Sequence, residues 1–110
     1  MVYVHSIMVP DSLLVAAARR FALLSDPTRL RLLGTLHEEG EMPVGELAAR
    51  SGVARDNASK HLARMADAGL LTRRRNGTGV IYSIADETLS QLCDLVCSSV
   101  REQARVLVGA

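Results

Sequence analysis

The chain contains 110 residues, of which 48% are hydrophobic, 23% are charged and only 3% are aromatic. This length accommodates a single domain, and the composition is that of a folded chain rather than a disordered one. The shortage of aromatic side chains predicts an aliphatic core and excludes a platform that stacks single-stranded nucleic acid, which needs exposed rings. No run of about 18 apolar residues is present, so we expect no membrane span.

The net charge of +1 conceals a polarity along the sequence. Residues 44–85 carry seven basic and three acidic side chains, a net charge of +4, whereas the rest of the chain has a net charge of −3. Such a basic middle segment suits a polyanionic partner, but a solvated charged surface gives the same count. Charge alone favours the solvated surface, so the pattern within the segment must decide.

The beginning of the chain carries no basic leader of the kind found in secretory signals. Two cysteines without an export signal predict a reduced, cytoplasmic protein rather than a disulfide scaffold. We interpret residues 1–10 as an N-terminal extension, either frayed and flexible or docked on a dimer. Residues 11–108 are expected to form one folded domain.

Apolar spacing, capping residues and turn signals predict five helices and one hairpin. The first helix begins at Asp11, and the second follows Asp26-Pro27, an N-cap with proline at the first helical position, and ends at Gly40. The others are expected as a short helix that follows Pro43 and ends at Ser51-Gly52, a longer helix over 54–68, a hairpin over 70–84 with its turn at 76–79, and a last helix capped by Asp86.

A short helix joined by a tight turn to a longer one is typical of a helix-turn-helix, and a basic hairpin directly after it is typical of a wing. We therefore predict a mainly α fold with a small β-hairpin. It is a winged helix-turn-helix with five helices and a two-stranded wing.

The helix over 54–68 has two contrasting faces. Ala58, Leu62, Met65 and Ala66 share one face at helical spacing, which is expected to pack on the preceding helices. The remaining surface is polar and rich in donors near the N-terminus, as a helix that enters a major groove requires. The candidate DNA-contacting residues of this helix are Arg55, Asp56, Asn57, Ser59, Lys60, His61 and Arg64.

Three of these residues, Arg55, Lys60 and His61, have competing interpretations. Asn57 can read adenine in two-point fashion, and Arg55 or Lys60 can reach guanine or phosphate. Arg64, one turn later, suits a phosphate. His61 either donates to phosphate or bridges two helices, and the sequence favours neither.

Arg73, Arg74 and Arg75 are predicted at the tip of the hairpin. Alternation along a strand places Arg73 and Arg75 on one face and Arg74 on the other. All three are candidates for phosphate or minor-groove contact. A soluble edge strand also carries such charges, but their place directly after a groove-shaped helix favours a wing.

Three segments together resemble the ArsR/SmtB family of winged-helix repressors. Residues 26–33, DPTRLRLL, are similar to the family signature before the helix-turn-helix. Residues 59–62, SKHL, with 68–71, AGLL, resemble its recognition helix and exit, and 80–84, VIYSI, its wing. The resemblance implies a homodimer that joins through its first and last helices, binds double-stranded operator DNA at two half-sites, and represses transcription until an inducer releases it.

Ala54 departs from this pattern, because family members commonly have Ser or Thr at the cap of the recognition helix. The side chain of Asp56 is an alternative partner for the first turn. In the wing, Thr78 follows the turn glycine where the family commonly has arginine. We expect DNA contact to survive with a different operator preference.

The two inducer sites that the resemblance implies are not expected in this chain. The arsenic-type Cys-x-Cys pair is absent from the short helix at 44–50. Asp86 and Glu102 stand at positions of the zinc-type site, but Thr88 and Ser99 replace its histidines, and carboxylates without imidazole make a poor zinc site.

Cys93 and Cys97 are the remaining inducer candidates, because a spacing of four places both thiols on one helical face. Four such thiols in a dimer suit a soft ion such as Zn(II), Cd(II) or As(III), with His5 or Glu102 assisting. They also suit a disulfide formed under oxidants, for which pairing between chains fits helix geometry better. The competing interpretation is a pair of small core hydrophobes. His37, at the end of the second helix, is interpreted as a solvated terminus rather than a ligand.

An enzyme is not expected, because the chain has neither a phosphate-cradling glycine loop between strand and helix nor a C-x-x-C pair. The alternative to a DNA-binding regulator is a winged-helix module that binds protein and has no inducer site. Such a module would expose apolar anchors where this chain has basic side chains.

Overall fold

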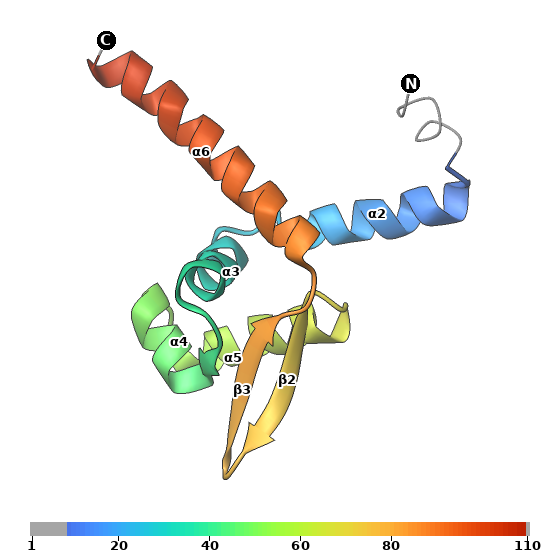
Figure 1. Ribbon diagram of the computed structural model, residues 1–110, viewed down its shortest axis with the longest axis vertical. Helices are drawn as coiled ribbons and strands as arrows, with labels where there is room; N and C mark the ends of the chain where they lie inside the picture. Colours follow the sequence, from blue (N-terminus) through green and yellow to red (C-terminus); the bar gives the residue numbers. More distant parts are fainter. Residues whose placement is uncertain (1–8, 110) are drawn as a thin grey trace.

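The computed structural model describes residues 9–109 and confirms the predicted order of helices and hairpin (Figure 1). Most of the predicted N-terminal extension, including His5, lies outside the described residues. The elements are α2 (Asp11–Leu23), α3 (Pro27–Glu39), β1 (Met42–Pro43), α4 (Val44–Ser51), α5 (Arg55–Asp67), β2 (Leu71–Asn76), β3 (Gly79–Ile84) and α6 (Glu87–Gly109).

The sheet has three strands rather than the two that the sequence predicts. Its order is β1-β3-β2, and both neighbouring pairs run antiparallel. In β1, Met42 pairs with Tyr82 of β3 and Pro43 pairs with Ile81. Both Met42 and Tyr82 are buried, so this short strand attaches the root of the wing to the core. The prediction was incomplete because two residues ending in proline carry no strand periodicity.

The predicted capping residues begin two of the helices. The Asp26 carboxylate accepts the backbone N–H of Arg29 at 2.9 Å and begins α3. The Asp86 carboxylate accepts the backbone N–H of Leu89 at 3.2 Å at the start of α6. Each bond satisfies a donor that has no partner within its own helix.

The core lies between α3, α4, α5 and the sheet and is almost entirely aliphatic, as predicted. Leu32, Leu47, Leu62 and Met65 are completely inaccessible to solvent. Each such side chain contributes about 1.5–3 kcal/mol of hydrophobic stabilisation. The other buried apolar residues are Leu23, Leu33, Leu36, Met42, Ala48, Ala58, Leu70, Leu71, Tyr82 and Leu89.

Helices α2 and α6 extend away from this core in different directions (Figure 1). The radius of gyration is 16.1 Å, against about 13 Å for a compact domain of this length. Only Leu23, at its end, is buried in α2. Among the described helices, none is long and apolar enough to cross a membrane.

Within residues 9–109, every large apolar side chain that remains exposed lies on α2 or α6. These residues are Leu13, Leu14, Val15 and Phe21 on α2, and Leu95, Val96, Val100, Val106, Leu107 and Val108 on α6. Scattered exposed apolar residues are normal, but their confinement to two helices marks an interaction surface. We call these two helices the arms.

We expect Leu62→Ala to lower the free energy of unfolding by about 2–5 kcal/mol, because it leaves a cavity under α5. Lys60→Ala is the matched control on the same helix, and it should change stability by no more than about 0.5 kcal/mol because Lys60 is exposed. Urea denaturation at one protein concentration measures both. Equal effects of the two substitutions would contradict the placement of α5.

Candidate nucleic-acid interface

Helices α4 and α5 form the predicted helix-turn-helix. Gly52 ends α4 with a φ of +69°, in the left-handed region that glycine adopts without strain. The N–H of Val53 then donates to the carbonyl of Ala48 at 3.0 Å, and the half-buried Val53 packs against the core. The turn therefore fixes the direction in which α5 leaves α4.

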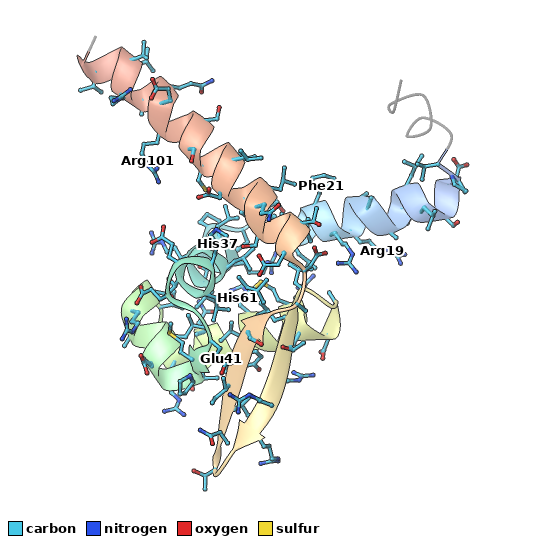
Figure 2. The ribbon with its side chains drawn as sticks, viewed as in Figure 1. Arg19, Phe21, His37, Glu41, His61 and Arg101 are labelled. Atoms are coloured by element: carbon cyan, nitrogen blue, oxygen red, sulfur yellow. The ribbon has the colours of Figure 1, made fainter. Side chains whose placement is uncertain are left out.

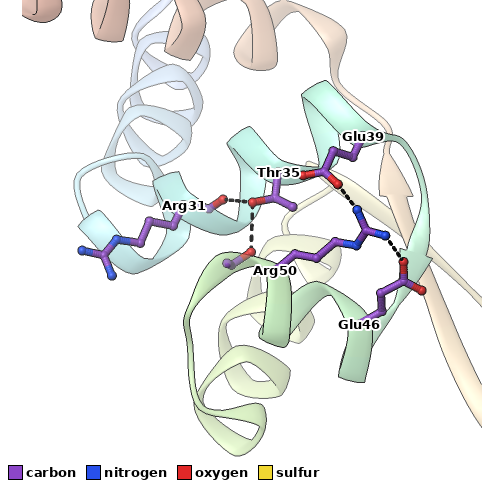
Figure 3. Close-up of polar contacts among 6 residues, drawn as sticks. Arg31, Thr35, Glu39, Glu46 and Arg50 are labelled. Carbon is purple, nitrogen blue, oxygen red and sulfur yellow. Dashed lines mark hydrogen bonds and ion pairs between the residues drawn. The ribbon is translucent and has the colours of Figure 1, made fainter.

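Polar contacts hold α4 against α3 (Figure 3). The Arg50 guanidinium pairs with Glu39 at the end of α3 and, at 2.9 Å, with Glu46 on its own helix. The Ser51 hydroxyl donates to the Thr35 hydroxyl at 3.0 Å, and Thr35 donates to the Arg31 carbonyl at 2.8 Å. These contacts join the last turn of α4 to α3.

The structure confirms the two faces predicted for α5. Ala58, Leu62 and Met65 are fully buried against the core, and Ala66 is half-buried. The opposite surface carries the exposed residues Arg55, Asp56, Asn57, Ser59, Lys60 and Arg64. Six of the seven side chains proposed on this helix are therefore free of the core.

The N-terminus of α5 begins without a side-chain cap. Ala54 occupies the cap position, and its methyl side chain has no oxygen that could accept a capping hydrogen bond. N–H groups of the first helical turn have no partner within a helix, which favours negative charge there. The Arg55 guanidinium packs against Gly45 at the start of α4. One of its nitrogens lies 3.3 Å from the position that a Cβ atom on residue 45 would occupy.

His61 lies in a different environment from its neighbours on α5. It is half-buried, and its Nδ1 lies 3.5 Å from a guanidinium nitrogen of Arg29 on α3. The Nε of Arg29 donates to the Leu23 carbonyl at the end of α2 at 2.7 Å. The geometry thus matches the interpretation of His61 as a bridge between helices. The role of Arg29 in this bridge had no signal in the sequence.

The wing arginines are spread along β2 rather than gathered at its tip. Arg73 lies opposite Tyr82, Arg74 opposite Ile81 and Arg75 opposite Val80. A hydrogen bond with Tyr82, followed by the pair with Asp67, raises the pKa of Arg73. All three side chains are exposed, but only Arg75 lies close to the turn.

Cys93 and Cys97 are free thiols on α6, the first half-buried and the second exposed. Burial, and then the neighbouring Cys97 thiol, raise the pKa of Cys93, which makes its thiolate scarcer at neutral pH. Both cysteines line two hollows, an apolar one beside Phe21 of α2 and one of mixed polar and apolar lining beside His37 of α3. Figure 2 shows Phe21 and His37 beside α6.

His37 is exposed, as expected of a helix terminus, but it is not only solvated. Its Nδ1 lies 2.5 Å from the hydroxyl of Ser90, which is 2% exposed. This bond joins the end of α3 to the first turns of α6. Within residues 9–109, no group of three or more His, Cys, Asp or Glu side chains is assembled to hold a metal ion.

Comparison with known proteins places this architecture in a family. A family model described as a helix-turn-helix domain matches residues 24–74. The chain is 36% identical over 84 residues to the transcriptional regulator KmtR of Mycobacterium tuberculosis, covering 76% of this chain and 64% of KmtR. It therefore spans less than two thirds of that relative.

Two further matches cover a larger share of the matched protein. One is the "probable mercury resistance operon repressor" of Streptomyces lividans, 33% identical over 90 residues, covering 82% of this chain and 71% of that protein. The other is the NMR structure of the homodimeric winged helix-turn-helix DNA-binding domain Mb0332 of Mycobacterium bovis, which is described as a possible ArsR-family transcriptional regulator. It is 33% identical with a TM-score of 0.74, covering 86% of this chain and 87% of that one. The chain belongs to the ArsR/SmtB family. Its fold is thus that of the ArsR-type winged helix-turn-helix transcriptional regulators.

Asp86 has a structural role in this ArsR-type chain. Its carboxylate caps α6 and also accepts a hydrogen bond from Arg20 of α2 at 2.6 Å. The same side chain therefore ties the two arms together. Both oxygens of this carboxylate therefore already accept a hydrogen bond.

We expect Asp26→Ala to destabilise the fold near neutral pH and to destabilise it less in acid. The backbone N–H of Arg29 holds the pKa of Asp26 below its ordinary value of 3.8. A carboxyl group whose pKa folding lowers stabilises the folded state above its unfolded pKa, and the contribution is lost as the pH falls through the folded value.

Urea titrations at about pH 7 and about pH 3 test this dependence. The control is Asp26→Asn, which keeps a capping oxygen without the charge and should show a smaller dependence on pH. An Asp26→Ala effect of the same size at both pH values would contradict the assignment.

Proposed function

We propose that the chain is a homodimeric, sequence-specific repressor that binds double-stranded operator DNA and is released by an inducer. The observation that carries the proposal is the exposed, donor-rich face of α5, which is backed by core packing and followed by a wing with three arginines. An apolar back and a polar front suit a helix that enters the major groove. As a regulator of this type it would act in the cytoplasm and catalyse no reaction.

The residues divide into base-reading and phosphate-binding groups. Asn57 and Lys60 lie on the exposed face within two turns of the helix start and are assigned to base edges, with Arg55 on a base or a phosphate. Ser59 and Arg64 are assigned to phosphates, and Asp56 lies in the uncapped first turn of the same helix. Arg73, Arg74 and Arg75 extend the contact from the wing. His61 is assigned to the link with Arg29 rather than to DNA.

The exposed apolar faces of α2 and α6 support a dimer. Covering them with a second copy removes from water the side chains that one chain leaves exposed. The relative Mb0332 is described as homodimeric. A two-fold dimer presents two copies of α5 to half-sites about one duplex turn apart, which predicts a palindromic operator.

The inducer is proposed to act at Cys93 and Cys97. One relative is named as a mercury resistance repressor, and thiols favour soft metal ions such as Zn(II), Cd(II) or As(III). The two thiols lie between α2 and α3, so a ligand on them bears on the arms and on the helix-turn-helix together. Glu102 lies further along α6, where it pairs with Arg105. A disulfide between chains is the alternative outcome at the same cysteines.

The rival function, a module that docks on another protein, predicts apolar anchors on α5. Within the described residues the large exposed apolar side chains are confined to the arms, and α5 carries none. This distribution favours DNA as the partner of α5.

We expect Asn57→Ala and Lys60→Ala to reduce the preference for operator over unrelated duplex by roughly 5- to 150-fold where the side chain reads a base. Fluorescence anisotropy titrations at several salt concentrations measure this, with the promoter of the chain's own gene as the first operator. Ser98→Ala, an exposed polar residue of α6 outside the proposed DNA surface, is the control and should bind like the wild type. An equal loss of affinity for every duplex would assign the residue to phosphate, and the absence of salt-sensitive binding by the wild type would contradict the proposed function.

We expect the double substitution Cys93→Ser and Cys97→Ser to leave operator affinity unchanged and to abolish release by Cd(II). The thiolate-to-metal charge-transfer absorption should disappear with it, because thiolates are the proposed ligands. Ser98→Ala, next to Cys97 on the same helix, is the matched control. Full release of the double variant from DNA by Cd(II) would place the inducer site elsewhere.

A further inference from the structure

We propose that Glu41 and Asp67 are positioning residues that hold Arg74 and Arg73 against the body of the protein, so that Arg75 carries the wing's main contact with phosphate. The inference rests on the proposed DNA-binding function. It divides three adjacent arginines, which the sequence separates only by strand face, into two restrained residues and one without a carboxylate partner among residues 9–109.

The two restraints come from different parts of the chain. Arg74 Nη2 lies 2.7 Å from Glu41 Oε1, and Glu41 directly precedes β1. Arg73 Nη2 lies 2.5 Å from Asp67 Oδ1, and Asp67 is the last residue of α5. Figure 2 shows Glu41 beside the sheet.

The pairing follows from the pleat of β2. Adjacent strand residues point to opposite faces, so Arg73 and Arg74 cannot share one carboxylate. The structure supplies one carboxylate to each face, Asp67 from α5 and Glu41 from the segment before β1. In the described part of the chain, Arg75 has no carboxylate partner.

Both ion pairs are exposed, with 44% to 67% of each side chain accessible. Exposed pairs add only about 0–1 kcal/mol to stability, so they do little to hold the fold together. The ion pairs act on DNA binding instead, because a phosphate must displace the carboxylate before it can pair with the arginine. The carboxylate also repels the approaching phosphates. Glu41 and Asp67 therefore weaken the wing's grip on any DNA and leave more of the discrimination to α5.

The test compares single variants in binding to an unrelated duplex across a salt series. Glu41→Gln and Asp67→Asn should each bind about two- to fivefold more tightly than the wild type, with a steeper salt dependence as an added phosphate contact forms. Arg75→Ala should flatten the salt slope by about 0.9, and Arg74→Ala should flatten it less. Glu102→Gln is the control, because it makes the same charge change in the exposed Arg105 pair on α6.

A second measurement reads the ion pairs without DNA. In NMR spectra of the free protein, the side-chain N–H groups of Arg73 and Arg74 should exchange with water more slowly than those of Arg75. Glu41→Gln should speed exchange at Arg74 alone. Equal rates at all three arginines would overturn the proposed restraint.

Two outcomes of the binding test would also overturn it. One is that Glu41→Gln and Asp67→Asn bind like Glu102→Gln, and the other is that Arg75→Ala leaves the salt slope unchanged. A wild type that shows no salt-sensitive binding would instead overturn the proposed function, and with it any role of these acids in DNA binding. The NMR measurement separates that result from a failure of the ion pairs themselves.

Discussion

The apolar faces of α2 and α6 are the constraint on which the arrangement of the molecule depends, because one chain cannot bury them. The arms contribute to the core between α3, α4, α5 and the sheet only near the body, through Leu23 of α2 and through Leu89, Leu92 and Cys93 of α6. Hydrophobic surface left in water is costly, so the arms need a partner surface of the same kind. In the proposed dimer, the way in which the arms cover each other also determines the position of the second copy of α5.

The arms are connected to α3 and α5 by a small number of polar contacts. Asp86 joins α6 to Arg20 of α2, and Arg29 joins the end of α2 to His61 of α5. His37 and Ser90 join α3 to α6 beside Cys93. A change at the two thiols would therefore have a route to α5 through the packed helices α2 and α3.

The sequence predicts those features that depend on local patterns. The spacing of Ala58, Leu62 and Met65 identified the buried face of α5, and Asp26 and Asp86 identified two helix starts. Strand β1 was missed because Met42 and Pro43 are too few to show alternation. The correct predictions, for the buried face of α5 and for the two helix starts, share one cause. In each case the relevant residues lie within two helical turns of each other.

Contacts between distant residues were not predictable in this way. Glu41 and Arg74 are 33 positions apart, and His37 and Ser90 are 53 apart, so no periodicity links either pair. Strand alternation separates Arg74 from the other two wing arginines, but only the fold distinguishes Arg75 from Arg73. For His61, the sequence left two interpretations open, and the position of Arg29 on the neighbouring helix favours the structural one.

The central claim is that the arms of two copies cover each other and thereby present two recognition helices to one operator. Analytical ultracentrifugation of the full chain, alone and with operator duplex, tests it most directly. We predict a mass twice the 11.9 kDa of one chain at micromolar concentration, and two chains on each duplex. A single-chain mass together with one chain bound per duplex at full affinity would contradict the claim.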